Sequence, residues 1–411
     1  MKNVIFLLSF LFVIHSVNAQ NEQNKGSSPS WVENIPESEV IEWRRHIHQN
    51  PELSFEEVNT SNYVAQLLES FGNIEVIRPT KTSVIGILKG NTPGKTVAFR
   101  ADMDALPVQE ETGLSFASTN VNVSHACGHD AHTAMLLGTA KTLSQMRDEI
   151  KGTVYFLFQH AEEQASGGAL EIIESGALND VDAFFGMHVL PDYPVGNVGI
   201  LPDGAASTTS DGFFLTINGK GSHGSMPQLG IDPIVVGAEI VNALQTVVSR
   251  NVTPGEMAVI TIGKFQSGDA PNVMPAKAEL AASVRTISEP TRQLVEERIK
   301  TIIENVTKAH AATYDLEYIR SYPAIQNESD LNSIARASAE KALGKEQVFE
   351  AARMTASEDF SYYKEIAPVC FMVLGVGEGV ANHNPEFNLD ENALSNGVKA
   401  EVQIVLDYLN N

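Results

Sequence analysis

The sequence predicts an α/β protein in which helices cover both faces of a mostly parallel sheet and an inserted ferredoxin-like α+β domain interrupts the chain. Short apolar segments alternate with helical ones in the first half of the chain and again near its end, which is typical of a sheet buried on both faces. Residues 206–320 instead follow the order β-α-β-β-α-β, the split arrangement of ferredoxin-like domains. The length of 411 residues suits two domains better than one.

The larger domain is predicted at residues 31–205 and 321–411. A helix broken near Pro51 is expected at 38–72, and a helix at 133–146 has one apolar face that can cover a sheet. The expected strands are continuous apolar runs at residues 83–88, 96–100, 153–159, 183–189 and 370–375.

The inserted domain is predicted at residues 206–320. Its two helices are expected at 232–250 and 290–310, where apolar residues recur at helical spacing. Its four strands are expected at residues 212–218, 256–265, 277–286 and 313–319.

The N-terminus resembles an export signal. Lys2 precedes an apolar run from Val4 to Ile14, and small Ala19 stands before polar Gln20. This pattern predicts a signal peptide at residues 1–19 and a flexible lead-in at 20–30. The run is too short to span a bilayer, so we expect a periplasmic or secreted protein that is free of the membrane after cleavage.

The composition is that of a soluble, acidic globular protein. Hydrophobic residues make up 43% and charged residues 19% of the chain, and the net charge is −23. Nucleic acid is excluded as a partner because binding it requires a basic surface that displaces counterions. A small-molecule substrate is the expected partner.

Acidic and imidazole side chains follow several of the predicted strands. Asp102 and Asp104 follow the strand at 96–100, Glu162 and Glu163 follow that at 153–159, and His188 ends that at 183–189. The segment after the last strand leads to His383. Ligands bind beyond the carboxyl ends of strands in open α/β sheets, so these side chains predict a metal site there.

One further segment carries side chains that bind transition metals. Cys127 and His129 lie in the sequence Ser-His-Ala-Cys-Gly-His-Asp-Ala-His that directly precedes the helix predicted at 133–146. A disulfide between Cys127 and Cys370 is the alternative for an exported protein. The position of Cys127 before a helix favours a thiolate ligand instead, while Cys370 starts an apolar run and suits a buried position.

Five motifs follow one another in the order found in a known enzyme family. They are Arg100-Ala-Asp-Met-Asp-Ala-Leu-Pro, His125-Ala-Cys-Gly-His-Asp-Ala-His, Gln159-His-Ala-Glu-Glu, Gly186-Met-His-Val and His383-Asn-Pro-Glu-Phe-Asn-Leu-Asp-Glu. The sequence resembles the hippurate hydrolases, N-acyl-amino-acid deacylases and indole-acetyl-amino-acid hydrolases, a branch of the dinuclear-metal aminoacylase and carboxypeptidase group. The resemblance extends from about Trp43 to Glu391.

The resemblance implies a dinuclear metal centre in the larger, catalytic domain. Its ligands would be Cys127, His129, Glu163, His188 and His383, with Cys127 as the bridge between two divalent ions. Zinc, manganese, nickel and cobalt all accept these ligand types. Glu162 would be the general base that takes a proton from metal-bound water.

The resemblance assigns roles to residues outside this ligand set. Asp104 would orient a ligand, which is the role of groups that hydrogen-bond a metal-bound imidazole. His223 would polarise the scissile carbonyl, in its own site or in that of a partner subunit. Asn272 and Arg285 would hold the substrate carboxylate, a task that suits the planar Arg fork. The inserted domain would act as a lid and as the surface of a homodimer.

The resemblance implies hydrolysis of the amide bond of N-acyl amino acids, such as N-acetyl or N-aroyl derivatives. An exported dipeptidase or carboxypeptidase with the same metal chemistry is the alternative. A binding protein that has lost catalysis is a third reading, which the presence of Glu162 and all the ligand types disfavours. One departure is Ala356, where relatives commonly carry Gly, and none of the five expected ligands is substituted.

Overall fold

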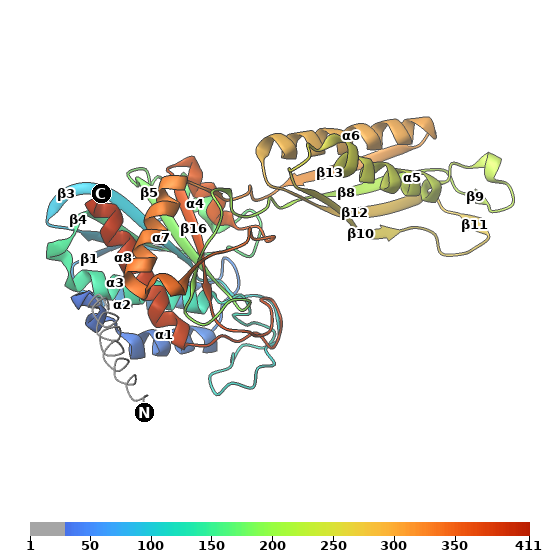
Figure 1. Cartoon of the computed structure of the whole chain (residues 1–411). Coiled ribbons are helices and arrows are strands. Elements are labelled where there is room, and N and C mark those ends of the chain that lie inside the picture. The colour runs from blue at the N-terminus through green and yellow to red at the C-terminus, as the bar shows by residue number, and fades with distance from the viewer. Residues whose placement is uncertain (1–28) are drawn as a thin grey trace, which may run out of the picture.

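A computed structural model describes residues 29–411, so the signal peptide predicted at 1–19 and most of the lead-in at 20–30 lie outside the described residues. Within these residues the chain forms a large α/β body and a smaller, elongated body that extends away from it (Figure 1). No helix between residue 29 and the C-terminus combines the length and apolar character needed to cross a membrane.

The large body is built on a ten-stranded sheet. Its main path has the order β1-β2-β4-β3-β5-β16-β14-β7, with β6 beside β16 and β15 beside β6. The central strands β4, β3, β5 and β16 are parallel, and β1 and β2 form an antiparallel edge. The strands are β1 (Ile74–Ile77), β2 (Val84–Lys89), β3 (Thr92–Asp102), β4 (Lys151–Gln159), β5 (Ala183–Leu190), β6 (Val198–Ile200), β7 (Gly204–Ala205), β14 (Gln326–Asn327), β15 (Val348–Glu350) and β16 (Val369–Gly375).

Both faces of this sheet are buried. Successive side chains of a strand point to opposite faces, so along β16 Met372 packs into one apolar core and Phe371 into another. One core includes apolar residues of α1 (Glu37–Gln49), α2 (Val58–Phe71), α3 (His129–Gln145), α7 (Ser329–Leu343) and α8 (Asn392–Asn410). The other includes residues of α4 (Gly168–Glu174) and the 3-10 helix Asp359–Glu365.

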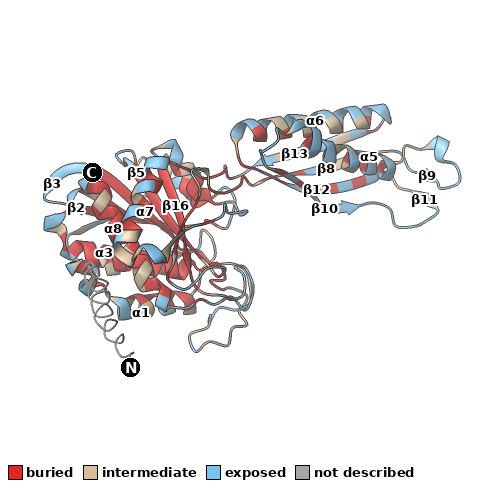
Figure 2. Ribbon diagram, viewed as in Figure 1, coloured by how far each residue is buried: buried red, intermediate tan, exposed pale blue. Residues whose placement is uncertain are grey.

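The smaller body is a four-stranded antiparallel sheet of order β10-β12-β8-β13, as in ferredoxin-like domains. Its core lies between the sheet and two helices, whereas many residues on its outer surfaces are exposed (Figure 2). A short ribbon of β9 (Ser222–His223) and β11 (Val273–Met274) lies at its far end (Figure 1). The other elements are β8 (Asp211–Asn218), α5 (Pro233–Thr246), β10 (Ala258–Gln266), β12 (Lys277–Thr286), α6 (Glu289–Ala309) and β13 (Thr313–Arg320).

The predicted fold class is confirmed by these two sheets and their helices. The helix expected at 232–250 differs in one respect, because α5 ends at Thr246 and a π-helical turn continues to Asn251. The domain limits at residues 205 and 320 stay a prediction.

A buried carboxyl group makes stability depend on pH. Glu401 of α8 is 2% exposed, its Oε2 accepts a hydrogen bond from Thr139 Oγ1 at 2.6 Å, and burial raises its pKa to about 8. Because the folded-state pKa exceeds the unfolded value, Glu401 favours folding fully below about pH 4.5, and this contribution is lost as the pH rises to about 8.

We therefore expect Glu401→Gln to stabilise the protein more at pH 8 than at pH 5, by up to roughly 1.4 kcal/mol for each unit of the pKa shift. Thermal denaturation at the two pH values measures this difference. The exposed helical residue Glu304, replaced by Gln, serves as the control. An equal effect of Glu401→Gln at both pH values would contradict the expectation.

Candidate metal centre

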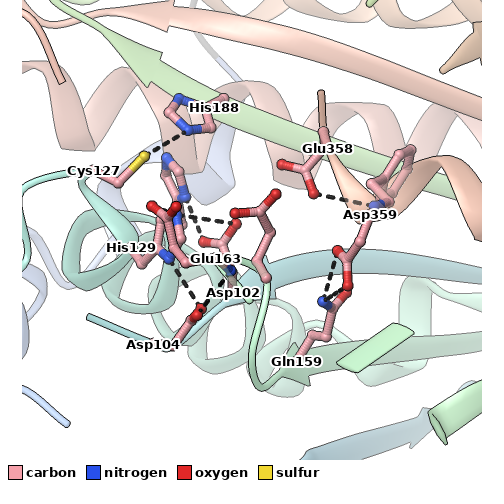
Figure 3. Close-up of polar contacts among 12 residues, drawn as sticks. Asp102, Asp104, Cys127, His129, Gln159, Glu163, His188, Glu358 and Asp359 are labelled. Carbon is pink, nitrogen blue, oxygen red and sulfur yellow. Dashed lines mark hydrogen bonds and ion pairs between the residues drawn. The ribbon is translucent and has the colours of Figure 1, made fainter. Parts of the chain in front are cut away.

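The carboxyl ends of three neighbouring parallel strands form the floor of the site. β3 leads into Asp102 and Asp104, β4 leads into Glu162 and Glu163, and β5 carries His188 near its end. The start of α3 adds Cys127 and His129, and the loop after β16 adds His383. Figure 3 shows several of these side chains converging from different elements.

Two groups of metal-binding side chains share Cys127. In one, ligand-type atoms of Cys127, His129 and His188 lie within 4.8 Å of one another, and in the other those of Cys127, Glu163 and His383 do. Cys127 Sγ is 3.4 Å from His188 Nε2, and His383 Nε2 is 3.2 Å from Glu163 Oε1. All five residues expected as ligands are therefore neighbours.

The imidazoles of the first group present free nitrogen lone pairs. His188 Nδ1 donates to the carbonyl oxygen of Val189 at 2.8 Å, so its Nε2 is the acceptor nitrogen that faces Cys127. His129 Nδ1 lies 3.2 Å from Asp104 Oδ1, which leaves its Nε2 as the acceptor.

Two buried atoms of this cluster, His129 Nε2 and Glu163 Oε1, take part in no well-formed hydrogen bond, although Glu163 Oε1 lies 3.2 Å from His383 Nε2. Leaving such atoms unpaired is unfavourable, and atoms of these types bind divalent transition metals. The residues present therefore fit a metal centre.

Two aspartates hold the imidazoles around the cluster. Asp104, expected to orient a ligand, contacts His129 and also accepts hydrogen bonds from the backbone N–H of Glu163 at 3.0 Å and from Ser54 Oγ at 2.7 Å. Asp102 Oδ1 lies 2.6 Å from His132 Nδ1. Because the backbone N–H of Val189 donates to His132 Nε2 at 2.9 Å, both nitrogens of His132 are occupied, and it supports the site without a free ligand atom.

Glu162 lies in a second, acidic group beside Glu358 and Asp359. It is 7% exposed, and burial, followed by the negative charges of Glu358 and Glu163, raises its pKa well above the usual range. Arg100 offsets part of this charge by donating to Glu358 Oε1 at 3.0 Å and to Asp359 Oδ1 at 2.8 Å. Sequence reasoning missed Arg100 and Glu358.

Arg285 lies with the cluster, as expected. It lines a cleft of about 360 Å³ together with Cys127, Glu162, His188 and other residues. Arg285 Nη1 donates to the carbonyl oxygen of Thr209 at 3.1 Å, and the other donors of its guanidinium remain for a ligand. A larger cavity of about 460 Å³, beside Thr209 and Lys364, contains none of the expected site residues.

His223 and Asn272 do not lie with the cluster. His223 is on the β9–β11 ribbon at the far end of the small body, and the backbone N–H of Gly224 donates to the carbonyl oxygen of Asn272 at 2.9 Å (Figure 1). The backbone N–H of Ser225 donates to His223 Nδ1, so Nε2 of this exposed side chain is an N–H donor.

Cys127 and Cys370 are both free. Cys370 is fully buried in the core that includes α3 and α8, and its Sγ donates to Asn332 Oδ1 at 3.1 Å. The disulfide alternative is therefore excluded, and Cys127 is available as a ligand.

Known proteins resemble the chain over most of its length. It is 48% identical over 290 residues to an N-acyl-L-amino acid amidohydrolase of Geobacillus stearothermophilus, covering 71% of this chain and 78% of the relative. It is 42% identical to an N-acetylcysteine deacetylase of Bacillus subtilis, and the alignment covers 87% of this chain and 93% of the relative. A solved Bacillus subtilis structure, described as a dinuclear metal-binding peptidase of family M20, is 38% identical to this chain with a TM-score of 0.81. The superposition covers 91% of this chain and 98% of that protein.

The predicted periplasmic or secreted location is wrong. The relatives that match most of the chain are named N-acyl-L-amino acid amidohydrolase and N-acetylcysteine deacetylase, names that refer to no export. The prediction rested on one lysine and a short apolar run within residues 1–19, outside the described part of the chain. Such a local pattern is independent of the fold and of the site.

The family assignment rests on a match that covers the strand ends and the loops of the site. The sequence profile of peptidase family M20/M25/M40 matches residues 98–407, which include Cys127, Glu162 and His383. The relatives described above are named as an amidohydrolase and a deacetylase, and this chain aligns with most of the length of each. The chain therefore belongs to peptidase family M20/M25/M40 and is a hydrolase of its metal-dependent amidohydrolase branch.

Proposed function

We propose that the protein hydrolyses the amide bond of N-acyl amino acids at the cleft beside Cys127. The single observation that carries this proposal is the pair of metal-binding groups sharing Cys127, with the buried carboxyl of Glu162 beside them and Arg285 in the same cleft. A metal centre, an acid–base group and a carboxylate-binding group are the three parts that such a reaction needs. The names of the relatives support the substrate class.

Two divalent transition-metal ions would be held by Cys127, His129, Glu163, His188 and His383. When bound, such ions polarise a carbonyl and lower the pKa of water. His129 Nε2 and Glu163 Oε1, which take part in no well-formed hydrogen bond, support this ligand set. Zinc, manganese, nickel and cobalt all suit a mixture of sulfur, nitrogen and oxygen donors.

Glu162 would move the protons of the reaction. Its raised pKa favours holding a proton taken from water and passing it to the leaving amine nitrogen, as a general base that then acts as an acid. Arg285 would hold the carboxylate of the substrate, since its guanidinium has donors left after it binds the Thr209 carbonyl oxygen.

His223 and Asn272 would act in the site of a second copy of the chain. They lie on the far ribbon, away from their own metal-binding cluster, so a role in catalysis requires the small body of a partner subunit. Exposed apolar side chains on this body, including Val235 (52% exposed) and Val273 (55%), support such an interface. His223 Nε2–H would donate to the substrate carbonyl oxygen.

Mixing two inactive variants tests this arrangement. We expect His223→Ala and Glu162→Gln each to lower turnover strongly. Their mixture should regain about one quarter of the wild-type activity if the chains pair at random, and about one half if only mixed dimers form, because each mixed dimer has one site with intact residues from both chains. Each variant mixed with itself is the control. A mixture no more active than the separate variants would show that His223 does not serve a partner's site.

A dipeptidase or carboxypeptidase reaction is the alternative with the same chemistry. Release of free α-amino groups from hippurate, N-acetyl amino acids and dipeptides, each with the four candidate metals, separates the two. The proposal expects the N-acyl amino acids to have the highest kcat/KM. Hydrolysis of dipeptides alone would favour the alternative, and hydrolysis of none would refute the proposed function.

A further inference from the structure

Glu57 is a buried acid outside the cleft. It directly precedes α2, its exposure is 0%, and its carboxylate is nevertheless bound on both oxygens. The backbone N–H groups of Phe55 and Ala161 donate to its Oε1 at 3.0 and 2.8 Å, and Thr82 Oγ1 donates to its Oε2 at 3.0 Å. Burying a carboxylate so deeply is costly unless it is hydrogen-bonded, and these three bonds meet that need.

The contact with Ala161 is the unusual one, because it joins segments that are 104 residues apart. Ala161 has a φ of 52°, in the left-handed region that residues with a Cβ disfavour. It lies between the end of β4 and the adjacent residues Glu162 and Glu163. Its backbone conformation therefore sets the direction in which the chain presents both carboxylates.

The next two residues are fixed in a similar way. Tyr322 donates its hydroxyl to the carbonyl oxygen of Glu162 at 2.8 Å, and the backbone N–H of Glu163 donates to Asp104 Oδ2 at 3.0 Å. Each residue of the segment 161–163 thus has one backbone group held by a side chain from elsewhere in the chain. Of the three, Ala161 is the residue with a positive φ; Glu57 binds its backbone N–H, and the backbone N–H of Gly168 donates to its carbonyl oxygen at 3.0 Å.

We propose that Glu57 is a positioning residue that keeps Ala161 in the left-handed conformation and so aims the carboxylate of Glu162 into the cleft. The catalytic consequence of this positioning rests on the proposed function of Glu162, whereas the effect of Glu57 on the conformation of Ala161 does not. The task needs a hydrogen-bond acceptor and not a charge. In agreement, burial raises the pKa of Glu57 to about 7, with a further contribution from the charge of Asp104.

Glu57→Ala and Glu57→Gln separate the acceptor from the charge. Glu57→Ala should speed hydrogen exchange of the backbone amides at residues 160–163 at least tenfold and lower kcat by about 10- to 100-fold, since a small misplacement of a reacting group has effects of that size. KM and metal content should change by less than about threefold, because Asp104 still holds Glu163. Glu57→Gln keeps an acceptor for Ala161 and should stay within about threefold of wild type.

A second substitution tests the conformational cause. Gly adopts positive φ freely, so adding Ala161→Gly to Glu57→Ala should raise kcat about tenfold above that of Glu57→Ala alone. The matched control is Glu52→Ala, which removes the acceptor for the backbone N–H groups of Asn59 and Thr60 in the first turn of α2. It should lower thermal stability without lowering kcat.

The outcomes distinguish this proposal from the proposed function. Unchanged exchange at residues 160–163 in Glu57→Ala would overturn the hold on Ala161, whatever the activity. Faster exchange with an unchanged kcat would overturn its link to Glu162. If the wild-type protein hydrolyses no N-acyl amino acid, the proposed function fails while the exchange measurement still tests the hold. If Glu57→Ala does not fold, failure of Glu57→Gln to match wild type would overturn the proposal.

Discussion

Replacing Glu162 by Gln is expected to lower turnover by roughly 10²–10⁴, the usual effect of losing a general base. Gln keeps nearly the shape of Glu but cannot accept a proton at neutral pH. The fold and the bound metal should be retained, because none of the five expected ligands is changed and replacing a buried carboxyl in an acidic group reduces charge repulsion. Steady-state kinetics and elemental analysis on the same preparation measure both quantities.

Glu163→Gln is the matched comparison, one residue along the same loop. Glu163 Oε1 lies 3.2 Å from His383 Nε2 and 3.9 Å from His129 Nε2, so a neutral amide at this position should weaken metal binding. If Glu162→Gln lost the metal while Glu163→Gln kept it, the two roles would have to be exchanged. Full activity of Glu162→Gln would require another base.

Replacing Cys127 by Ala should have the second large effect, because Cys127 belongs to both metal-binding groups. We expect both ions to bind more weakly and activity at limiting metal to fall more than about 100-fold, beyond what losing a supporting contact costs. Metal content after dialysis and kcat/KM measured against metal concentration report the change.

Cys370→Ala is the control for Cys127→Ala. Cys370 is also buried, but its Sγ contacts Asn332 in the core and no residue of the metal-binding groups. This variant should lose some stability and retain its full metal content. A Cys127→Ala protein with two tightly bound ions would contradict the assignment of Cys127 as the shared ligand.

Local patterns in the sequence predicted the fold class and grouped candidate metal-binding side chains at one edge of the sheet, while the choice of the five ligands came from the resemblance to a known family. Apolar runs predict the strands, and parallel strands place their carboxyl ends at one edge, so His188 and Glu163 could be grouped without coordinates. The partners of these residues could not be predicted in this way. Arg100 and Glu358 are 258 residues apart, and nothing in either segment indicates the other.

The sequence also could not predict which residues of the inserted domain lie near the metal-binding cluster. Arg285 and Asn272 were assigned the same task, yet the first lines the cleft and the second lies on the far ribbon. Arg285 lies near the end of β12, whereas Asn272 directly precedes β11 of the separate two-stranded ribbon, a separation that the order of strands alone does not reveal. Glu57 was missed for a related reason, since the residue that it holds, Ala161, lies 104 residues further along the chain.

The central claim is that a two-ion centre at Cys127 hydrolyses N-acyl amino acids. Its most direct test is to titrate the metal-depleted protein with each of zinc, manganese, cobalt and nickel while following release of the free amine from an N-acetyl amino acid. We predict no hydrolysis without metal and, with at least one of these ions, activity that rises and levels off at about two equivalents per chain. Full activity of the metal-depleted protein, or saturation with metal and no amine released, would contradict the account.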